Sequence, residues 1–260
     1  MYKLLVLVLV LVFQANGSLP VVLIHGVAST SLQLNDLKMY FESYNLDVYV
    51  IDISFLQSLI APLHIQLYEV CNQINRKSIL SNGFNILGIS QGGLLARGYV
   101  EKCNEYPVNN LLTWVAPHGG VYIPFDGSIL MYDSYVQQHF PISNYWRDPY
   151  NYEIYLTNSQ FLSQLNNELN SNLSTQQHKN LEKLKNFVLV WSTVDELLNP
   201  PQSGCFYTFN PESTTLNNTF YKTLLNNVNT IIYESNCKHD DYIKPECFEL
   251  LSNITMPYLM

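Results

Sequence analysis

The sequence predicts an α/β protein in which helices cover both faces of a mostly parallel sheet. Short apolar segments alternate along the chain with segments of helical periodicity, a pattern typical of βαβ units. Hydrophobic residues make up 47 % of the 260 residues and charged residues only 13 %, which is typical of a chain with a substantial core. The alternation breaks between residues 118 and 185, where we expect a mostly helical insertion over one edge of the sheet.

Six apolar segments are expected as strands. The first, LPVVLIHG at residues 19–26, is a continuous Val-containing run of the kind found in strands buried on both faces. The others are residues 46–53, 84–89, 110–117, 186–191 and 229–234. Helical spacing of apolar residues predicts helices at residues 31–44, 64–76 and 91–104, and a last helix starting at Pro245. With no internal repeat or linker, residues 18–260 are expected to form one domain that carries the insertion.

The first 17 residues have the features of a secretory signal peptide. Lys3 precedes an apolar run from Leu4 to Phe13, and Ala15-Asn16-Gly17 forms a small-x-small cleavage site. The run is shorter than the ~20 apolar residues that span a bilayer. We therefore expect cleavage and entry into the secretory pathway, with an uncleaved anchor as the alternative. No other segment is long and apolar enough to predict a transmembrane helix.

Secretory entry makes disulfides possible among the five cysteines. Cys71 and Cys103 lie on the helices before and after the strand at 84–89, so a bridge between them would clamp these helices together. Cys237 and Cys247 flank His239, and their pairing would hold the intervening loop. Cys205 is then left over. The cysteine spacing does not match a zinc site, and we expect neither a metal nor another cofactor.

Charge and short motifs add two further expectations. The formal net charge of −8 argues against a nucleic-acid partner, which would require clustered Lys and Arg. Asn172, Asn217 and Asn253 each begin an Asn-x-Ser/Thr motif and are candidate glycosylation sites. The chain is rich in Asn, which raises the chance rate of such motifs, and we attribute most of this richness to a compositional bias.

The segment GISQGG, residues 88–93, predicts a nucleophile. Gly88, Ser90 and Gly92 form a G-x-S-x-G motif between a predicted strand and a predicted helix. In this context the motif is typical of a nucleophile elbow, a tight turn that raises the serine hydroxyl above the end of the strand. The alternative is a glycine-rich turn with a solvated serine. A catalytic serine also needs oxyanion donors, and backbone amides after the serine and after an early strand provide them in α/β-hydrolases. We expect the amides of Gln91 and Val27 in these roles.

The serine requires a histidine base that follows it in the chain, as in α/β-hydrolases. His239 is the preferred candidate because it lies in a loop between the last strand and the last helix. His118 follows the fourth strand and is expected to line the site at most. His139 and His178 fall in the insertion and are expected to face solvent. His25 precedes Ser90, so we expect it to be structural.

An acid must orient the histidine, and it should follow a late strand. Asp195 comes a few residues after the predicted fifth strand, and the adjacent Glu196 is its rival. Asp240 and Asp241 are next to the histidine, and adjacent residues rarely reach each other's rings in the required geometry. Asp148 lies in the insertion and fits the chain order less well.

Several segments together resemble the palmitoyl-protein thioesterase family of lysosomal α/β-hydrolases. They are LPVVLIHG, ILGISQGGLLAR, NYWRDPYNYEIYLTNSQFLSQLNNE and FVLVWSTVDELLNPPQSGCFYTF, and the resemblance spans residues 19–254. The run from NYWRDP to LNNE resembles the lid of this family. The resemblance implies that Ser90, Asp195 and His239 form the triad, that Val27 and Gln91 are the oxyanion donors, and that Cys71 pairs with Cys103.

The resemblance implies hydrolysis of long-chain fatty acyl thioesters in the lysosome or after secretion. The Cys237/Cys247 pair is more similar to the second lysosomal branch of the family, so the acyl acceptor stays open between a protein cysteine and CoA. A lipase or carboxylesterase acting on oxygen esters is the alternative enzyme. A catalytically inactive lipid-binding protein is the non-enzymatic alternative. Apolar residues of the insertion would form either an acyl groove or simply the core of the insertion.

Overall fold

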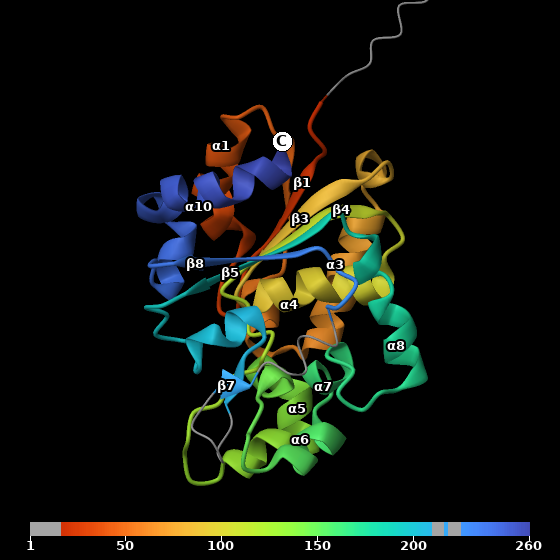
Figure 1. Ribbon diagram of the computed structural model, residues 1–260, viewed down its shortest axis with the longest axis vertical. Helices are drawn as coiled ribbons and strands as arrows, with labels where there is room; N and C mark the ends of the chain where they lie inside the picture. The colour runs from red at the N-terminus through yellow and green to blue at the C-terminus, as the bar shows by residue number, and fades with distance from the viewer. Residues whose placement is uncertain (1–16, 210–215, 218–224) are drawn as a thin grey trace, which may run out of the picture.

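The computed structural model describes residues 17–209, 216–217 and 225–260. The predicted signal peptide therefore lies outside the described residues, apart from Gly17. A six-stranded parallel sheet with the order β2-β1-β3-β4-β5-β8 occupies the centre of the molecule (Figure 1). Its strands are β1 (Val21–Ile24), β2 (Val48–Val50), β3 (Phe84–Ile89), β4 (Val108–Trp114), β5 (Asn186–Ser192) and β8 (Thr230–Ser235).

All six predicted strands are present, and β3 has the predicted bounds. The central strands β1 and β3 are fully buried, as continuous apolar segments require. By contrast, β2 covers only three residues of the segment predicted at 46–53. This strand lies at the edge of the sheet and pairs with β1 alone, so fewer hydrogen bonds extend it.

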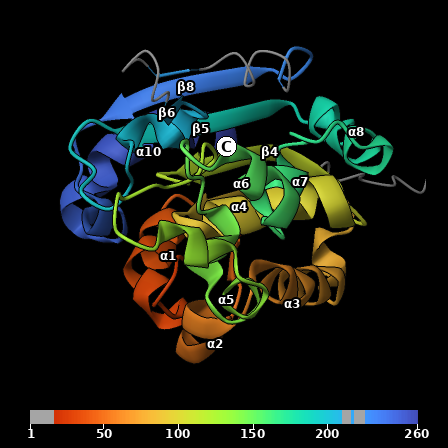
Figure 2. The same cartoon turned by 90° about the horizontal axis from the view of Figure 1, so that it is seen from below.

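Helices cover both faces of the sheet. On one face α1 packs against α10, and on the other α3 packs against α4 (Figures 1 and 2). The α-helices of the described residues are α1 (Asn35–Glu42), α2 (Phe55–Ile60), α3 (Leu63–Asn75), α4 (Gln91–Gly98), α5 (Ser134–His139), α6 (Tyr152–Asn158), α7 (Leu162–Leu165), α8 (Asn172–His178) and α10 (Pro245–Leu259). A π-helical turn, η3 (Tyr99–Cys103), extends α4, and 3₁₀ turns occur at η1 (Ser31–Leu34), η2 (Ser78–Leu80), η4 (Ser128–Tyr132), η5 (Pro141–Tyr145), η6 (Leu181–Lys183), η7 (Pro201–Cys205) and η8 (His239–Ile243).

Helix α2 and the strand pair β6/β7 were not predicted from the sequence. Helix α2 begins after Ser54, whose hydroxyl accepts a hydrogen bond from the Gln57 backbone amide. The Gln57 side-chain oxygen in turn accepts one from the Ser54 backbone amide. This capping box is visible in the sequence as S-x-x-Q, but the helix is too short for a clear period. The second element is a small antiparallel pair, β6 (Thr208–Phe209) and β7 (Leu216–Asn217).

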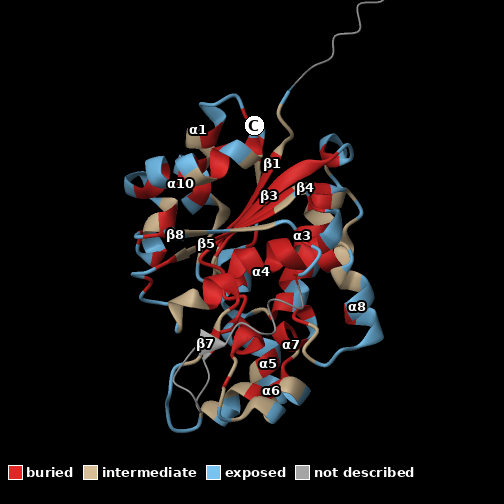
Figure 3. Ribbon diagram, in the orientation of Figure 1, coloured by how far each residue is buried: buried red, intermediate tan, exposed pale blue. Residues whose placement is uncertain are grey.

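The insertion at residues 118–185 is helical, as predicted, and we call it the lid. It contains α5 to α8, and it has no strand in the main sheet among the residues described. Its interior is built around the Glu168 carboxylate. This group accepts hydrogen bonds from Arg147, Tyr152, Tyr155 and Asn166, so the buried charge is fully paired. Figure 3 shows buried segments continuing from the sheet into this part of the molecule.

A row of asparagines, which we call the Asn ladder, crosses the amino ends of the strands. The Asn229 amide donates to Asn186, Asn186 donates to Asn110, and Asn110 donates to Asn85, at 2.7–2.9 Å. Asn110 also donates to the Tyr258 carbonyl at the end of α10, at 2.7 Å. The ladder therefore satisfies a carbonyl group that a helix end leaves without a partner. These four asparagines are structural, whatever the origin of the overall Asn content.

Both predicted disulfides are present. Cys71 on α3 is bonded to Cys103 in η3, and Cys237 is bonded to Cys247 on α10. Cys205 is free and buried, and burial raises the pKa of its thiol to about 12. Within the described ranges, none of the helices has the length and apolar character needed to cross a bilayer.

Candidate active site

Ser90 occupies a strained turn between β3 and α4. Its φ of 54° and ψ of −128° are unusual for a residue other than glycine. A Cβ atom added to Gly88 would lie 2.3 Å from the Gly92 carbonyl oxygen, and one added to Gly92 would lie 2.4 Å from the His25 carbonyl oxygen. The positions two residues before and two residues after the serine must therefore both be glycine. This is the geometry of the predicted nucleophile elbow.

The side chains of Ser90, His239 and Asp195 form a continuous hydrogen-bonded relay. His239 Nε2 lies 2.8 Å from Ser90 Oγ, and His239 Nδ1 lies 2.8 Å from Asp195 Oδ2. The other carboxylate oxygen of Asp195 accepts hydrogen bonds from the amides of Leu197 and Leu198, at 2.9 and 2.8 Å. The carboxylate is thus held from two sides and directs the imidazole toward the serine hydroxyl.

The rival acids occupy other positions. Glu196 accepts a hydrogen bond from the His239 backbone amide at 3.2 Å and makes no hydrogen bond to the ring. Asp240 is exposed at the edge of the pocket, and Asp241 pairs with Lys244 on the surface. Asp148 is buried in the lid, where it accepts hydrogen bonds from neighbouring lid residues.

Three other histidines lie away from the relay. His118 is fully buried, stacks on Phe206 at 4.6 Å between ring centroids, and does not line the pocket. Burial lowers its pKa well below 6.5, with a smaller contribution from the positive charge of Arg97. The expectation that His178 faces solvent is wrong, because its ring contacts the buried carboxylate of Glu101. His139 is exposed, as expected.

The loop after β1 brings Val27 close to Ser90. A Cβ added to the preceding Gly26 would lie 3.1 Å from the Ser90 Cβ, which shows how closely the loop approaches the elbow. The two ring nitrogens of His25 lie 2.9 Å from the Gly26 and Ile53 carbonyl oxygens, and the neutral ring donates to one of them, which fixes the start of this loop, as expected of a structural residue. In the described part of the chain, the amides of Val27 and Gln91 have no hydrogen-bond acceptor.

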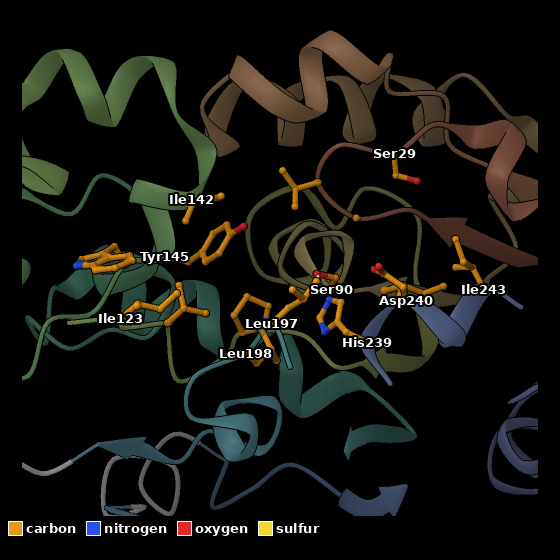
Figure 4. A pocket seen from close by; sticks show the side chains of 16 residues that line it. Ser29, Ser90, Ile123, Ile142, Tyr145, Leu197, Leu198, His239, Asp240 and Ile243 are labelled. Atoms are coloured by element: carbon orange, nitrogen blue, oxygen red, sulfur yellow. Dashed lines mark hydrogen bonds between the residues drawn. The ribbon is translucent and has the colours of Figure 1, made fainter. Parts of the chain in front are cut away.

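A largely apolar pocket of about 280 Å³ opens beside Ser90 and His239 (Figure 4). The lid contributes Ile123, Ile142 and Tyr145 to its wall. Leu197 and Leu198 line it from the loop that carries the relay carboxylate, and Val27 and Ser29 from the loop after β1. A pocket of this kind suits an apolar ligand with one reactive polar group placed next to the serine.

Only some of the lid's apolar residues line the pocket. Tyr145 and Trp146 line it, whereas Tyr155, Phe161 and Leu162 are buried in the lid interior. The core alternative therefore holds for the three buried residues, and the acyl groove stays a prediction for the two that line the pocket.

The profile of the palmitoyl protein thioesterase family matches residues 20–239. The chain belongs to this family. It is 31 % identical to palmitoyl-protein thioesterase 3 of Dictyostelium discoideum over 99 % of this chain and 98 % of that protein. It is also 33 % identical to lysosomal thioesterase PPT2-B of Xenopus laevis, over 82 % of this chain and 80 % of that protein.

Solved structures with low sequence identity share the fold. A monoacylglycerol lipase of Paleococcus ferrophilus superimposes with a TM-score of 0.57 at 15 % identity, over 93 % of this chain and 95 % of that one. The mature lipase BlEst2 of Bacillus licheniformis gives a TM-score of 0.55 at 13 % identity, over 94 % and 93 %. Together with the parallel sheet and the elbow, these likenesses show that the chain has the α/β-hydrolase fold.

The sequence did not reveal the role of the Gln91 side chain. Its amide donates hydrogen bonds to the Ser58 carbonyl at 3.1 Å and to Gln66 at 3.0 Å. Its oxygen accepts one from the Tyr145 hydroxyl of the lid at 3.3 Å. The residue after the nucleophile thus joins α2, α3 and the lid. A Gln at this position was visible in the sequence, but its partners lie 25 to 54 residues away.

Two of the three glycosylation candidates can be placed in the structure. Asn172 and Asn253 are exposed, whereas the Asn217 side chain lies outside the described residues. Glycosylation stays a prediction for all three. Over residues 17–209, 216–217 and 225–260, no cluster of three His, Cys, Asp or Glu residues could hold a metal ion.

Proposed function

We propose that this protein is a serine hydrolase that cleaves long-chain fatty acyl thioesters through an acyl-enzyme on Ser90. The observation that carries the proposal is the Asp195–His239–Ser90 relay beside an apolar pocket, in a chain of the palmitoyl protein thioesterase family. The relay supplies an activated nucleophile, and the pocket supplies a surface suited to an acyl chain.

In the first step, Ser90 Oγ attacks the thioester carbonyl carbon while His239 Nε2 takes the hydroxyl proton. The carbonyl π electrons move onto oxygen to give a tetrahedral oxyanion. Asp195, hydrogen-bonded to His239 Nδ1, stabilises the imidazolium that forms. Because Asp195 accepts two backbone hydrogen bonds as well, the carboxylate does not have to reorganise during this step.

The backbone amides of Val27 and Gln91 would stabilise the oxyanion, since they are unpaired donors in the described part of the chain. Collapse of the tetrahedral intermediate breaks the C–S bond and releases a thiolate. A thiol has a pKa of about 8.5, so its thiolate leaves with little need of protonation. The imidazolium supplies the proton that the departing sulfur takes up.

In the second step, water attacks the acyl-serine. His239 takes a proton from this water, the carbonyl oxygen is again held as an oxyanion, and the ester C–O bond breaks. The proton returns to Ser90 Oγ, and a fatty acid is released. The balance over both steps is one thioester and one water converted to one thiol and one carboxylic acid.

Hydrolysis of a palmitoyl-thioester peptide by the wild type and by Ser90→Ala tests the proposal. We expect a loss of at least about 10³-fold in kcat in the variant, because only binding and oxyanion effects remain. Equal rates would refute the proposal. Matched thioester and oxygen-ester substrates of one chain length test the substrate class, and a preference for the oxygen ester would favour a lipase or carboxylesterase.

A series of acyl-CoA and S-acyl-peptide substrates would identify the acceptor, a protein cysteine or CoA. For localisation, we propose residues 1–17 as a signal peptide and the lysosome or the extracellular space as the destination. Two observations support this localisation. One relative is called a lysosomal thioesterase, and the structure has two disulfides. Mass measurement of the mature N-terminus after secretion tests the cleavage.

A further inference from the structure

Three stretches around the pocket carry no Asp, Glu, Lys or Arg. They are residues 53–68, which include α2, residues 117–125 at the start of the lid, and residues 134–146, which include α5 and η5. Charged residues make up only 13 % of the chain, so other uncharged stretches occur in it, and what sets these three apart is their position. Two of them contribute residues to the pocket wall, and α2 in the third packs against η5.

Large apolar side chains are exposed in these stretches. Six that are each at least 40 % exposed form a group that we call the apolar rim. Its members are Phe55, Leu56, Ile60, Ile123, Phe140 and Ile142. On α2 the inward residue is Ser58, which is fully buried, while Leu56 and Ile60 lie one turn apart on the outer surface. Helix α2 thus has an apolar face that no described part of the chain covers.

The apolar rim is continuous with the pocket. Ile123 and Ile142 belong to the rim and also line the pocket, on the lid side (Figure 4). On the opposite side, Ser58 of α2 is hydrogen-bonded to Ser29, which lines the pocket. Helix α2 also packs against η5, so the two halves of the rim adjoin, and Figure 2 shows α2 beside α5. The lid half of the rim therefore borders the pocket directly, and the α2 half adjoins it through η5.

We propose that the apolar rim docks on the surface of a phospholipid bilayer, with the pocket mouth facing the lipid. The proposal rests on the proposed function for its substrate, because a long acyl chain attached to a protein or lipid is stored in membranes. A short helix with an outward apolar face can lie at the level of the lipid headgroups. Docking would let the acyl chain pass from bilayer to pocket without crossing water.

The absence of basic residues specifies the kind of membrane contact. Interfacial helices that depend on anionic lipid have Lys or Arg on their polar face, and their binding weakens with salt. The three stretches that carry the rim contain neither residue, so we expect its contact with lipid to be apolar. We therefore expect binding to vesicles of phosphatidylcholine alone, with little dependence on salt concentration. A second copy of the chain is the main competing occupant.

The experiment measures co-sedimentation with phosphatidylcholine vesicles for the wild type, Leu56→Glu/Ile60→Glu and a matched control, Ile79→Glu/Leu173→Glu. Ile79 and Leu173 are exposed and lie outside the rim, so both double variants add two negative charges at exposed apolar positions. We expect the rim variant to lose at least about tenfold in vesicle binding, because two apolar side chains no longer enter the interface. We expect the control to bind like the wild type.

Activity gives an independent readout. The rim variant should lose a similar factor on a palmitoyl-thioester peptide held in vesicles and retain its rate on a water-soluble short-chain thioester. Ser90→Ala should bind vesicles like the wild type, so binding can be judged even if the proposed hydrolysis is wrong. Wild-type protein that does not sediment with vesicles, or a rim variant that binds like the wild type, would overturn the proposal. A concentration-dependent dimer that the rim substitutions abolish would assign the rim to a second copy and also overturn it.

Discussion

The two ends of the parallel sheet each carry a chain of hydrogen-bonded side chains. At the carboxyl end, Asp195, His239 and Ser90 are three different residues held on loops and a strained turn. At the amino end, the Asn ladder links identical residues that lie in or directly beside the strands. The relay can move a proton, whereas the Asn ladder cannot, because neutral amides only donate and accept hydrogen bonds.

This difference separates activity from stability. Loops at the carboxyl ends of parallel strands can present side chains to a substrate, whereas the amino end here is closed by the last turn of α10. Substitutions at the carboxyl end should therefore change the reaction more than the fold. Those in the Asn ladder should change the fold more than the reaction.

The largest effect is expected at the carboxyl end, from Asp195→Asn. The amide would favour the wrong imidazole tautomer and could not stabilise the imidazolium, so kcat should fall about 10³–10⁴-fold. Thermal unfolding should change little. Asp241 pairs with Lys244 at the surface, and Asp241→Asn is the matched control that should leave kcat unchanged. A small effect of Asp195→Asn, comparable to the control, would contradict the assigned role.

At the amino end, Asn110→Ala should lower the free energy of unfolding by about 2–4 kcal/mol, since it leaves several buried polar groups without partners. Asn110 donates to both Asn85 and the Tyr258 carbonyl and accepts from Asn186. Urea denaturation measures this loss. The kcat of the folded fraction should equal that of the wild type, and a large loss of kcat would mean that the two ends are not independent.

Acid should lower the stability of the whole fold through two buried histidines near the carboxyl ends of the strands. Burial lowers the pKa of His118 well below 6.5, and burial also lowers the pKa of His25. As the pH falls below about 6.5, the unfolded chain therefore binds protons that the folded chain excludes, and the free energy of unfolding decreases. Denaturation between pH 7 and 5 should show a slope of up to about 1.4 kcal/mol per pH unit from each group.

His118→Gln should remove part of that slope, whereas Asn110→Ala should shift the stability curve down without changing its slope, because asparagine does not titrate. Identical slopes for the wild type and His118→Gln would show that His118 does not carry the acid sensitivity. The comparison needs only the difference in slope, so a constant loss of stability in either variant does not affect it.

The smallest effect is expected where the lid meets the elbow. Tyr145→Phe removes the hydrogen bond to the Gln91 side chain while the ring still lines the pocket. We expect kcat to fall about three- to tenfold, as for the loss of about one neutral hydrogen bond, with KM little changed. A raised KM at constant kcat would mean that Tyr145 only contacts the acyl chain.

The sequence predicted the residues of the relay because their order along the chain and their positions after strands are fixed by the fold. It predicted β3 well because a buried parallel strand is a continuous apolar segment. The contacts of Gln91 and the pairing of His178 with Glu101 could not be predicted, since each joins residues far apart in the chain. Helix α2 was missed because six residues are too few to show a helical period.

The Asn ladder also has a consequence for the order of folding. Its bonds join residues that are 25, 76 and 43 positions apart, so it can close only after β3, β4, β5 and the segment before β8 have assembled. We expect an interaction that needs all these strands in place to be absent from the folding transition state. Asn186→Ala should therefore speed unfolding and leave the refolding rate nearly unchanged. The Asn ladder would then contribute to kinetic stability, because it slows the unfolding of the native state.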